Sequence, residues 1–212
     1  MVMSRAAHVV GLMLAAIPAW GAAIEATVVD AAGKPMADVA VWALSPGAPA
    51  EARGVRAQIE QLDREFLPYL TVIQQGTTVT FPNRDPILHH IYSFSPAKPF
   101  EIKLYTGRSP SEIVFDKAGV VTLGCNIHDW MVAYVLVVST PHFARTDAAG
   151  LARLRDLPAG AYEVRAWHPQ QTVAAAPQNL ALEVAAVGRA QFIVDQKVRK
   201  PKYKPPLDRT RY

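Results

Sequence analysis

Hydrophobic residues in this chain fall in short runs that are separated by clusters of Gly, Pro, Asp and Asn. Two such runs, Val120 to Leu123 and Val132 to Val138, lie on either side of one polar loop. Another run begins at residue 24, breaks at a turn that contains Asp, Gly and Pro, and resumes as far as residue 44. Short apolar runs bounded by turn residues are typical of strands. The pattern therefore predicts an all-β protein.

One segment departs from this pattern. Between residues 51 and 66 the apolar side chains are spaced by four, three and four positions: Val55, Ile59, Leu62 and Phe66. That spacing would place them on one face of a helix. We therefore expect one short helix from Glu51 to Phe66, packed against the β-structure.

The polar loop after Leu123 carries the most informative residues of the chain. It reads Gly-Cys-Asn-Ile-His-Asp-Trp-Met and contains a thiol at Cys125, an imidazole at His128 and a thioether at Met131. A tight turn between two strands lets such side chains converge. A soft thiolate and a weak thioether select copper over zinc, and a trigonal copper site of this kind takes a second histidine. The loop therefore predicts three ligands of one copper ion.

The missing histidine is expected in the segment 79–90, where a strand pattern is followed by a polar turn with proline. His89 is the candidate, six positions after Asn83. The two stretches resemble the cupredoxin family, and within it the amicyanin group, whose ligand loop has the same short Cys-x-x-His-x-x-Met spacing. The resemblance covers roughly residues 66–138. Because two motifs match in order and with flanking strands, it is more specific than Cys-x-x-His alone.

This resemblance implies a Greek-key β-sandwich that holds one type 1 copper ion through four ligands: His89, Cys125, His128 and axial Met131. It also implies that Asn83 bonds across to the ligand loop and supports it from behind. His90 follows His89 directly, and neighbours in an extended segment point to opposite faces. We therefore expect His90 on the outside, although related sequences more often carry Asn at that point.

Apolar residues flank the two histidines in the same loops: Leu88, Ile127 and Trp130, together with Ile87. In cupredoxins the imidazole edge that corresponds to His128 reaches the surface through an apolar patch. Two interpretations stay open here. The side chains form a docking patch for a redox partner, or they shield the copper from water.

The N-terminus has the pattern of an export signal. Arg5 precedes an apolar run from Val9 to Ile17, and small residues follow at positions 21–23. The run is too short to span a bilayer, so we expect a signal peptide over residues 1–23 that is cleaved on export to the periplasm. Cys125 is the only cysteine, which excludes an intramolecular disulfide. In an oxidising compartment, a lone thiol beside His128 favours metal binding over a buried, inert cysteine.

Segments on both sides of the copper region resemble a carboxypeptidase regulatory-like, or transthyretin-like, sandwich with an Ig-like fold. One interpretation inserts a cupredoxin domain, residues 46–140, into a loop of that sandwich. Residues 24–45 then supply its first strands and residues 141–195 the remainder. The other interpretation assigns residues 24–44 to the copper sheet itself and leaves 141–195 as an appendage. About 190 mature residues suffice for either arrangement.

The formal charge of +4 is distributed unevenly. Residues 196–212 contain seven basic side chains against Asp208, and prolines stand at 201, 205 and 206. We expect an extended basic tail, which either only solvates the chain or contacts acidic surfaces such as an anionic membrane. The remainder is mildly acidic. The sequence has no nucleic-acid-binding motif and no later apolar run long enough to span a membrane, so we expect neither a nucleic-acid partner nor a transmembrane segment.

These features predict a periplasmic blue copper protein that carries electrons between redox partners, such as a periplasmic dehydrogenase or a cytochrome. Four protein ligands leave no open position for a substrate, so we do not expect an enzyme. Two alternatives stay open: a copper trafficking or storage protein, and a non-redox binding module built on the second sandwich. The resemblance to amicyanins suggests a link with methylamine utilisation, but the length of a ligand loop encodes no partner.

Overall fold

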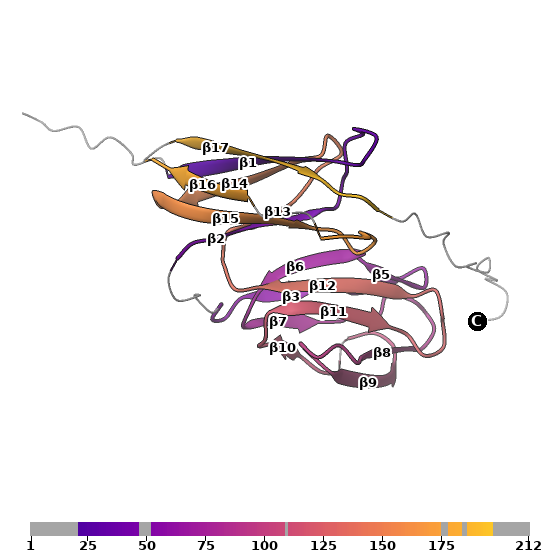
Figure 1. Ribbon diagram of the computed structural model, residues 1–212. Coiled ribbons are helices and arrows are strands. Elements are labelled where there is room, and N and C mark those ends of the chain that lie inside the picture. Colours follow the sequence, from indigo (N-terminus) through magenta and orange to yellow (C-terminus); the bar gives the residue numbers. More distant parts are fainter. Residues whose placement is uncertain (1–20, 47–51, 109, 175–177, 184–185, 197–212) are drawn as a thin grey trace, which may run out of the picture.

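The computed structural model describes residues 21–46, 52–108, 110–174, 178–183 and 186–196. Over these ranges the chain is all β, as the sequence predicts, and contains no helix (Figure 1). The strands are β1 Ala22–Val29, β2 Ala40–Leu44, β3 Arg56–Gln58, β4 Glu60–Leu62, β5 Glu65–Leu67, β6 Leu70–Gln74, β7 Thr77–Thr80, β8 His89–Ser93, β9 Phe100–Tyr105, β10 Ile113–Phe115, β11 Gly119–Gly124, β12 Val132–Val138, β13 Phe143–Arg145, β14 Leu151–Leu157, β15 Gly160–Trp167, β16 Gln178–Leu182 and β17 Val187–Ile193. The expected signal peptide up to residue 20 and the basic tail from residue 197 lie outside the described residues.

The prediction of a helix between residues 51 and 66 is wrong. The described part of that segment forms three short strands, β3, β4 and β5. Ile59 and Phe66 are buried, whereas Val55 and Leu62 are exposed. The helical spacing is therefore a coincidence, because only Ile59, between β3 and β4, and Phe66 of β5 face the core, whereas the buried residue of β4 is Gln61.

The central part of the molecule is a sandwich of two sheets (Figure 1). One has the strand order β6-β12-β11-β8-β9 and the other β10-β7-β3. Within the larger sheet, β12 runs antiparallel to β11 and parallel to β6. Their facing sides enclose one hydrophobic cluster that includes Phe81, Phe115 and Leu123, all fully buried. Alternating residues of the strands supply this core, which gives the ligand loops a rigid base.

The remaining strands form a second pair of sheets, with the orders β14-β1-β17 and β13-β2-β15-β16. They enclose a separate hydrophobic cluster that includes Ile24, Leu157 and Phe192. β1 pairs with β14 and β17, and β2 pairs with β13 and β15. The chain thus leaves these sheets after β2, forms the central sandwich and returns at β13. Residues 24–44 therefore do not contribute strands to the central sandwich.

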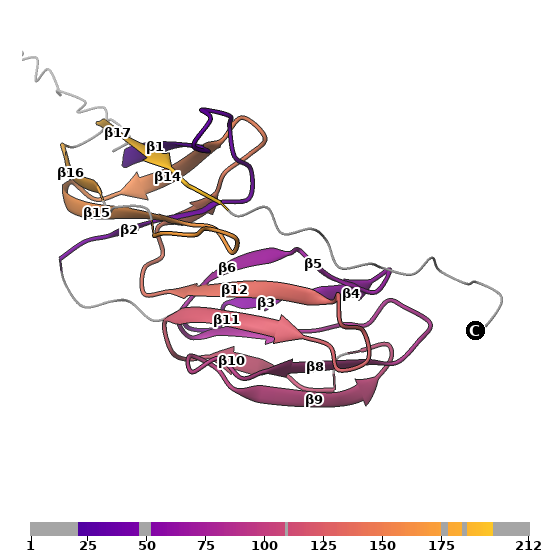
Figure 2. The same ribbon diagram turned by 45° about the vertical axis from the view of Figure 1, so that its right-hand side comes forward.

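The two pairs of sheets pack against each other through a small apolar cluster (Figure 2). Leu70, Leu136 and Val138 of the central sandwich are buried there against Ala40 of β2. Arg145 of β13 adds a polar contact, since its Nη1 donates to the carbonyl oxygen of Leu70 at 3.0 Å. The contact covers strands β6 and β12, and it leaves the loops at the ends of the central sheets accessible.

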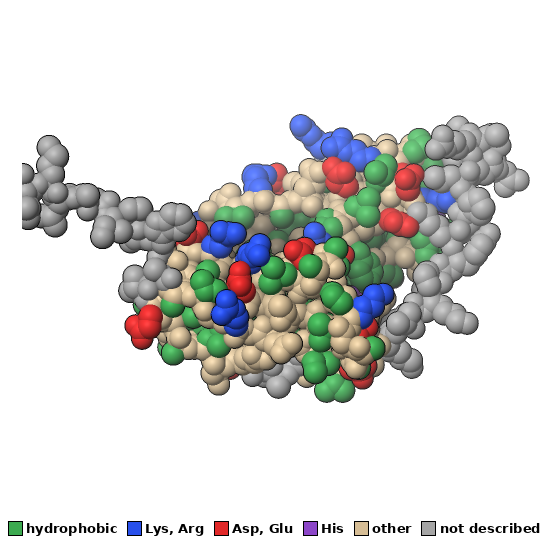
Figure 3. Space-filling model, turned by 90° about the horizontal axis from the view of Figure 1, so that it is seen from above, with side chains coloured by type: hydrophobic (Ala, Val, Ile, Leu, Met, Phe, Trp, Pro, Cys, Tyr) green, Lys and Arg blue, Asp and Glu red, His purple; other side chains and the backbone are tan. Residues whose placement is uncertain are grey.

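Seen from above, the second sandwich presents basic and acidic side chains that are interspersed (Figure 3). Arg153 of β14 pairs with Glu25 of the neighbouring β1 at 3.2 Å. On this face of the second sandwich, charges of both signs therefore lie close together. Within the described ranges, no helix has the length and apolarity needed to cross a membrane.

Candidate metal centre

The two segments with predicted ligands meet at one end of the central sandwich. His89 is the first residue of β8, and Cys125 follows the last residue of the neighbouring strand β11. Two backbone hydrogen bonds close the loop from Cys125 to Met131. The Cys125 amide donates to the Met131 carbonyl at 3.3 Å, and the Met131 amide donates to the His128 carbonyl at 2.9 Å. Adjacent strands therefore bring together residues that are 36 positions apart.

His89, Cys125 and His128 form a compact cluster of potential ligands. One donor atom from each residue lies within 4.8 Å of the other two. The Nδ1 atoms of the histidines are 3.1 Å apart, and the Cys125 Sγ atom is 3.8 Å from Nδ1 of His128. Ligands that are each about 2.0–2.3 Å from a shared metal ion lie roughly 3–4 Å from one another. The cluster therefore has the dimensions of a metal site.

The environment of Cys125 favours its thiolate form, which is the form that binds metals. The side chain is 4% exposed, and burial alone would raise the pKa of the thiol. Hydrogen bonds from His89 and from the backbone amides of His90, Ile127 and His128 more than offset burial, so the pKa of Cys125 is lowered. The loop thus makes deprotonation of Cys125 easier, and the deprotonated sulfur is the form that binds a metal.

The two histidines of the cluster have different electrostatic surroundings. Burial would lower the pKa of His89, but hydrogen bonds to Cys125 and Asp85 raise it above its ordinary value. The pKa of His128 is lowered by burial and by the positive charges of His89 and Arg64. A bound cation would compete with protons for the nitrogen of His89 and the sulfur of Cys125.

Asp85, a residue that the sequence analysis missed, fixes the ring of His89. Its Oδ2 lies 2.7 Å from His89 Nε2, which leaves Nδ1 directed at the cluster. The same carboxylate accepts the backbone amides of Asp63 and Arg64 at 2.7 and 2.8 Å. Burial would raise the pKa of Asp85, but these hydrogen bonds lower it. A carboxylate behind a ligating histidine sets both the ring orientation and the tautomer.

Asn83 holds the loop in front of His89 by contacts that differ from the expected ones. Its Nδ2 donates to the carbonyls of Ile87 and Tyr105, both at 2.8 Å, and its Oδ1 accepts the amide of Asp85 at 2.9 Å. Both amide hydrogens are thereby used within its own loop and at the end of β9. Instead of a bond across to the Cys125 loop, Asn83 supports the site through Asp85.

The other predicted site residues occupy distinct surroundings. Met131 is 1% exposed and belongs to the same hydrophobic cluster as Cys125. Leu88 and Ile127 are both 48% exposed. Trp130 is half-buried, and its Nε1 donates to the Arg64 carbonyl at 3.1 Å. The loops thus present two apolar side chains to solvent and keep a third in contact with the protein.

His90 is directed away from the cluster, as alternation along a strand predicts. Its Nε2 lies 2.8 Å from a carboxylate oxygen of Glu101 on β9. The side chain is nevertheless buried rather than outside, because β9 covers it. His142 and His168 lie beyond β12, in the part of the chain that forms the second sandwich, and do not join the cluster.

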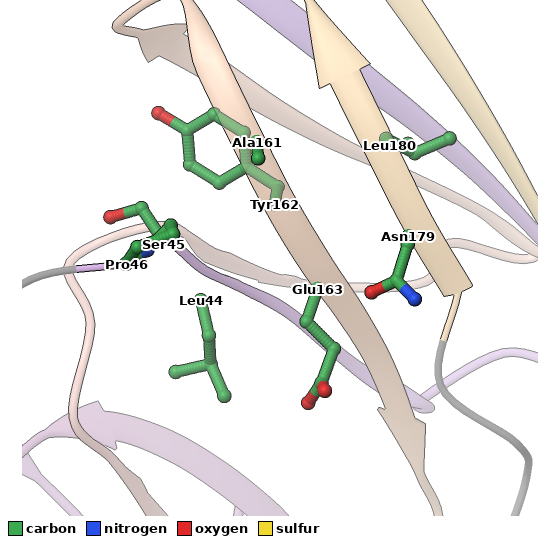
Figure 4. Close-up of a pocket in the computed structure, with 8 residues that line it drawn as sticks. All are labelled: Leu44, Ser45, Pro46, Ala161, Tyr162, Glu163, Asn179 and Leu180. Atoms are coloured by element: carbon green, nitrogen blue, oxygen red, sulfur yellow. The ribbon is translucent and has the colours of Figure 1, made fainter.

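A groove of about 360 Å³ lies on the second sandwich, at the ends of β2, β15 and β16 (Figure 4). Its lining is mostly apolar, and two of its polar side chains, Tyr162 and Glu163, make hydrogen bonds of their own. The Tyr162 hydroxyl donates to the Pro158 carbonyl at 2.9 Å, and Glu163 accepts a hydrogen bond from Arg165. The groove is therefore mainly apolar, with Ser45 and Asn179 as its other polar side chains, in contrast to the polar cluster around His89.

No family model matches the sequence, and no curated protein matches it. Several solved structures are similar to part of the chain. They include the reduced form of an amicyanin mutant, with 19% identity over 45% of this chain and 98% of that chain, at a TM-score of 0.37. A purple cupredoxin from Nitrosopumilus maritimus has 30% identity over 39% of this chain and 99% of that chain, at a TM-score of 0.35. A copper-containing nitrite reductase from Thermus scotoductus SA-01 has 22% identity over 53% of this chain and 28% of that chain, at a TM-score of 0.37.

Proposed function

Because the central region of this chain belongs to the cupredoxin family, we propose that the protein is a type 1 copper protein that carries electrons between redox partners. The observation that supports this most strongly is the cluster of His89, Cys125 and His128, whose donor atoms lie within 4.8 Å of one another. Two imidazoles and one thiolate are the equatorial ligands of blue-copper sites. We assign Met131 as the weak fourth ligand.

Each residue of the site then has a distinct role. Cys125 supplies the thiolate, and His89 and His128 supply neutral imidazoles. Asp85 orients the His89 ring, and Asn83 holds the loop that contains Asp85. A bound copper ion would supply one-electron chemistry between its +1 and +2 states. A rigid ligand set limits the rearrangement that accompanies each change of charge, and this suits electron transfer.

The burial of the ligands favours a carrier over an enzyme. His89, Cys125 and Met131 are all less than 5% exposed, and only His128 is half-buried. A catalytic metal keeps an open position for a substrate, and four protein ligands would leave none. The electron would pass through the edge of His128, and Leu88 and Ile127 would form the apolar docking patch around it.

The remaining assignments follow from this role. We place the protein in the periplasm after removal of residues 1–23, with a cytochrome or a dehydrogenase as its redox partner. We divide the mature chain into a cupredoxin domain, residues 46–140, inserted between residues 24–45 and 141–195 of a second sandwich. The strand pairing of β2 with β13 supports this division, because it joins the two ends of the insertion.

The visible absorption spectrum of the copper-loaded protein tests the proposal. We expect a strong thiolate-to-Cu(II) charge-transfer band, one copper per chain, and complete loss of the band in Cys125→Ser. Copper binding without such a band would contradict a type 1 site. A blue protein that passes copper to an acceptor faster than it exchanges electrons with any redox partner would instead be a trafficking protein.

A further inference from the structure

The two-residue turn between β4 and β5 contacts both segments that carry the ligands. Asp63 and Arg64 form this turn with φ angles of 52° and 58°. Such angles are usual for the two central residues of a tight hairpin, but Gly, Asn or Asp normally occupy them. Arg64 is a long cation in this position and is only 6% exposed. A buried charge at a position that disfavours side chains indicates a specific role.

The backbone of Arg64 connects the two ligand segments. Its amide donates to Asp85 Oδ2, the same oxygen atom that lies 2.7 Å from His89 Nε2. Its carbonyl accepts the indole N–H of Trp130 from the Cys125 loop. One residue thus fixes the carboxylate behind one histidine and the aromatic ring beside the other.

The side chain of Arg64 reinforces the second connection. Its guanidinium carbon lies 5.7 Å from the centre of the Trp130 ring, within the range of a cation–π contact. The Trp130 ring in turn lies 5.2 Å from the His128 ring, at an interplanar angle of 47°. The positive charge of Arg64 is therefore held close to the ligand through which we expect the electron to pass.

We propose that Arg64 is a positioning residue that joins the two ligand loops through Asp85 and Trp130, and that its buried charge raises the reduction potential of the copper. The second part rests on the proposed function. A nearby cation disfavours the more positive Cu(II) state and so favours reduction, and its effect is large where water is excluded. Neither ligand motif contains Arg64, so a change there leaves all four ligands in place.

Arg64→Gly separates the two contributions of this residue. Glycine retains the amide and the carbonyl and suits the left-handed backbone, so only the side chain with its guanidinium is lost. Arg64→Asn also tolerates this backbone and provides a second variant without the charge. Arg64→Lys keeps the charge but loses the planar group above Trp130. Arg84→Gln is the matched control. Arg84 is an exposed cation near the same hairpin, and its Nη2 lies 3.5 Å from Oε1 of Glu60 on β4.

Two measurements are needed: the reduction potential of the copper-loaded proteins, and the indole N–H resonance of Trp130 in the metal-free proteins, assigned with Trp130→Phe. We expect Arg64→Gly and Arg64→Asn to keep the blue band, lower the potential, shift the Trp130 resonance and weaken copper binding about tenfold or more. Arg64→Lys should keep a potential close to that of the wild type and still shift the resonance. Arg84→Gln should change neither.

The proposal is overturned if the variants without the charge match Arg84→Gln in both potential and Trp130 resonance. If Arg64→Gly does not fold, Arg64→Asn and Arg64→Lys decide the same question. If the wild type forms no blue site, the proposed function fails. The metal-free Trp130 resonance then still decides whether Arg64 joins the loops.

Discussion

The two sandwiches differ in what they bury. In the described residues, the second sandwich and the link that leads into it bury three polar side chains: Thr140, Thr146 and His168. The central sandwich and its loops bury eight: Gln61, Arg64, Thr77, Asn83, Asp85, His89, His90 and Ser93. Burial of a polar group costs free energy unless hydrogen bonds replace its contacts with water. A fold that accumulates such groups in one region does so where they have a chemical task.

The buried polar groups of the central sandwich are also connected to one another. Asn83 bonds to Asp85, Asp85 bonds to His89, and the amide of Arg64 bonds to the same carboxylate. In the second sandwich, by contrast, the hydroxyl of Thr146 accepts the amide of Val39 and donates to the carbonyl of Met36, both in the segment that precedes β2. The comparison indicates that the connected buried polar groups of the described residues belong to the central sandwich.

The largest expected difference is between two variants in which one of the neighbouring histidines, His89 or His90, is replaced by alanine. His89→Ala should abolish the copper site, because it removes a ligand and leaves Asp85 buried without its imidazole partner. His90→Ala should keep the site, since its ring faces Glu101 on β9. His168→Ala is the matched control in the second sandwich, where the ring is similarly buried. Copper titrations followed by visible absorption check this, and equal loss in both β8 variants would contradict the assignment of His89.

Asp85→Asn should destabilise the metal-free protein by about 2 kcal/mol, because hydrogen bonds to a buried charged group each contribute roughly 1.5–3 kcal/mol. Asp147→Asn is the control in the second sandwich. Its carboxylate also accepts two backbone amides, from Ala149 and Leu151, but on an exposed turn. We therefore expect a smaller loss of unfolding free energy in Asp147→Asn. Chemical denaturation of both metal-free variants tests the difference, and equal losses would show that the buried carboxylate of Asp85 stabilises the fold no more than an exposed one.

The pH dependence of that stability has a defined sign. The pKa of Asp85 is lowered in the folded protein, so its stabilising contribution is complete above its ordinary value of about 3.9. The contribution disappears as the pH falls through the lowered folded-state pKa. The difference in unfolding free energy between the wild type and Asp85→Asn should therefore shrink as the pH falls below about 4. A difference that grows on acidification would mean that Asp85 is not ionised in the folded protein.

A smaller effect is expected from the fourth ligand. Met131→Leu preserves the volume of a buried side chain, so we expect a loss of stability below about 1.5 kcal/mol. The copper should stay bound, because the thioether bond is long and weak. The reduction potential should rise, since a donor to Cu(II) has been removed. Voltammetry of the blue variant decides this, and a lower potential with an unchanged spectrum would exclude Met131 as a ligand.

The smallest structural effect is expected at the surface. Leu88→Asp should slow electron exchange with a partner and leave the blue band nearly intact, because Leu88 is 48% exposed beside the site. Val187→Asp, at a residue with 50% exposure on the second sandwich, should not change the rate. Stopped-flow rates at several ionic strengths compare the two. Unchanged exchange in Leu88→Asp would show that the apolar side chains shield the metal and do not dock a partner.

The sequence was sufficient to predict the strands on either side of the Cys125 loop and the proximity of His89, Cys125 and His128. These predictions succeed because alternation and turn residues are local signals, and because Cys125 and His128 lie in one loop. His89 was also predictable, although its place beside Cys125 depends on the pairing of β8 with β11.

Other parts of the site were not predictable from the sequence. Arg64 and Trp130 are 66 positions apart, and only the tertiary fold brings them together. Asp85 stands four residues before His89 in the chain, but its role depends on the two amides of the β4–β5 turn. The sequence analysis missed that turn, because the apolar residues around it have the spacing expected of a helix.

X-ray absorption at the copper edge of the Cu(II)-loaded protein tests the central claim most directly. Comparison with Cys125→Ser isolates the contribution of sulfur. We expect the wild type to contain two imidazole nitrogens and one strongly bound sulfur, and we expect the strong sulfur contribution to disappear in the variant. A shell of nitrogen and oxygen alone in the wild type, or a spectrum that Cys125→Ser does not change, would contradict a copper site built on His89, Cys125 and His128.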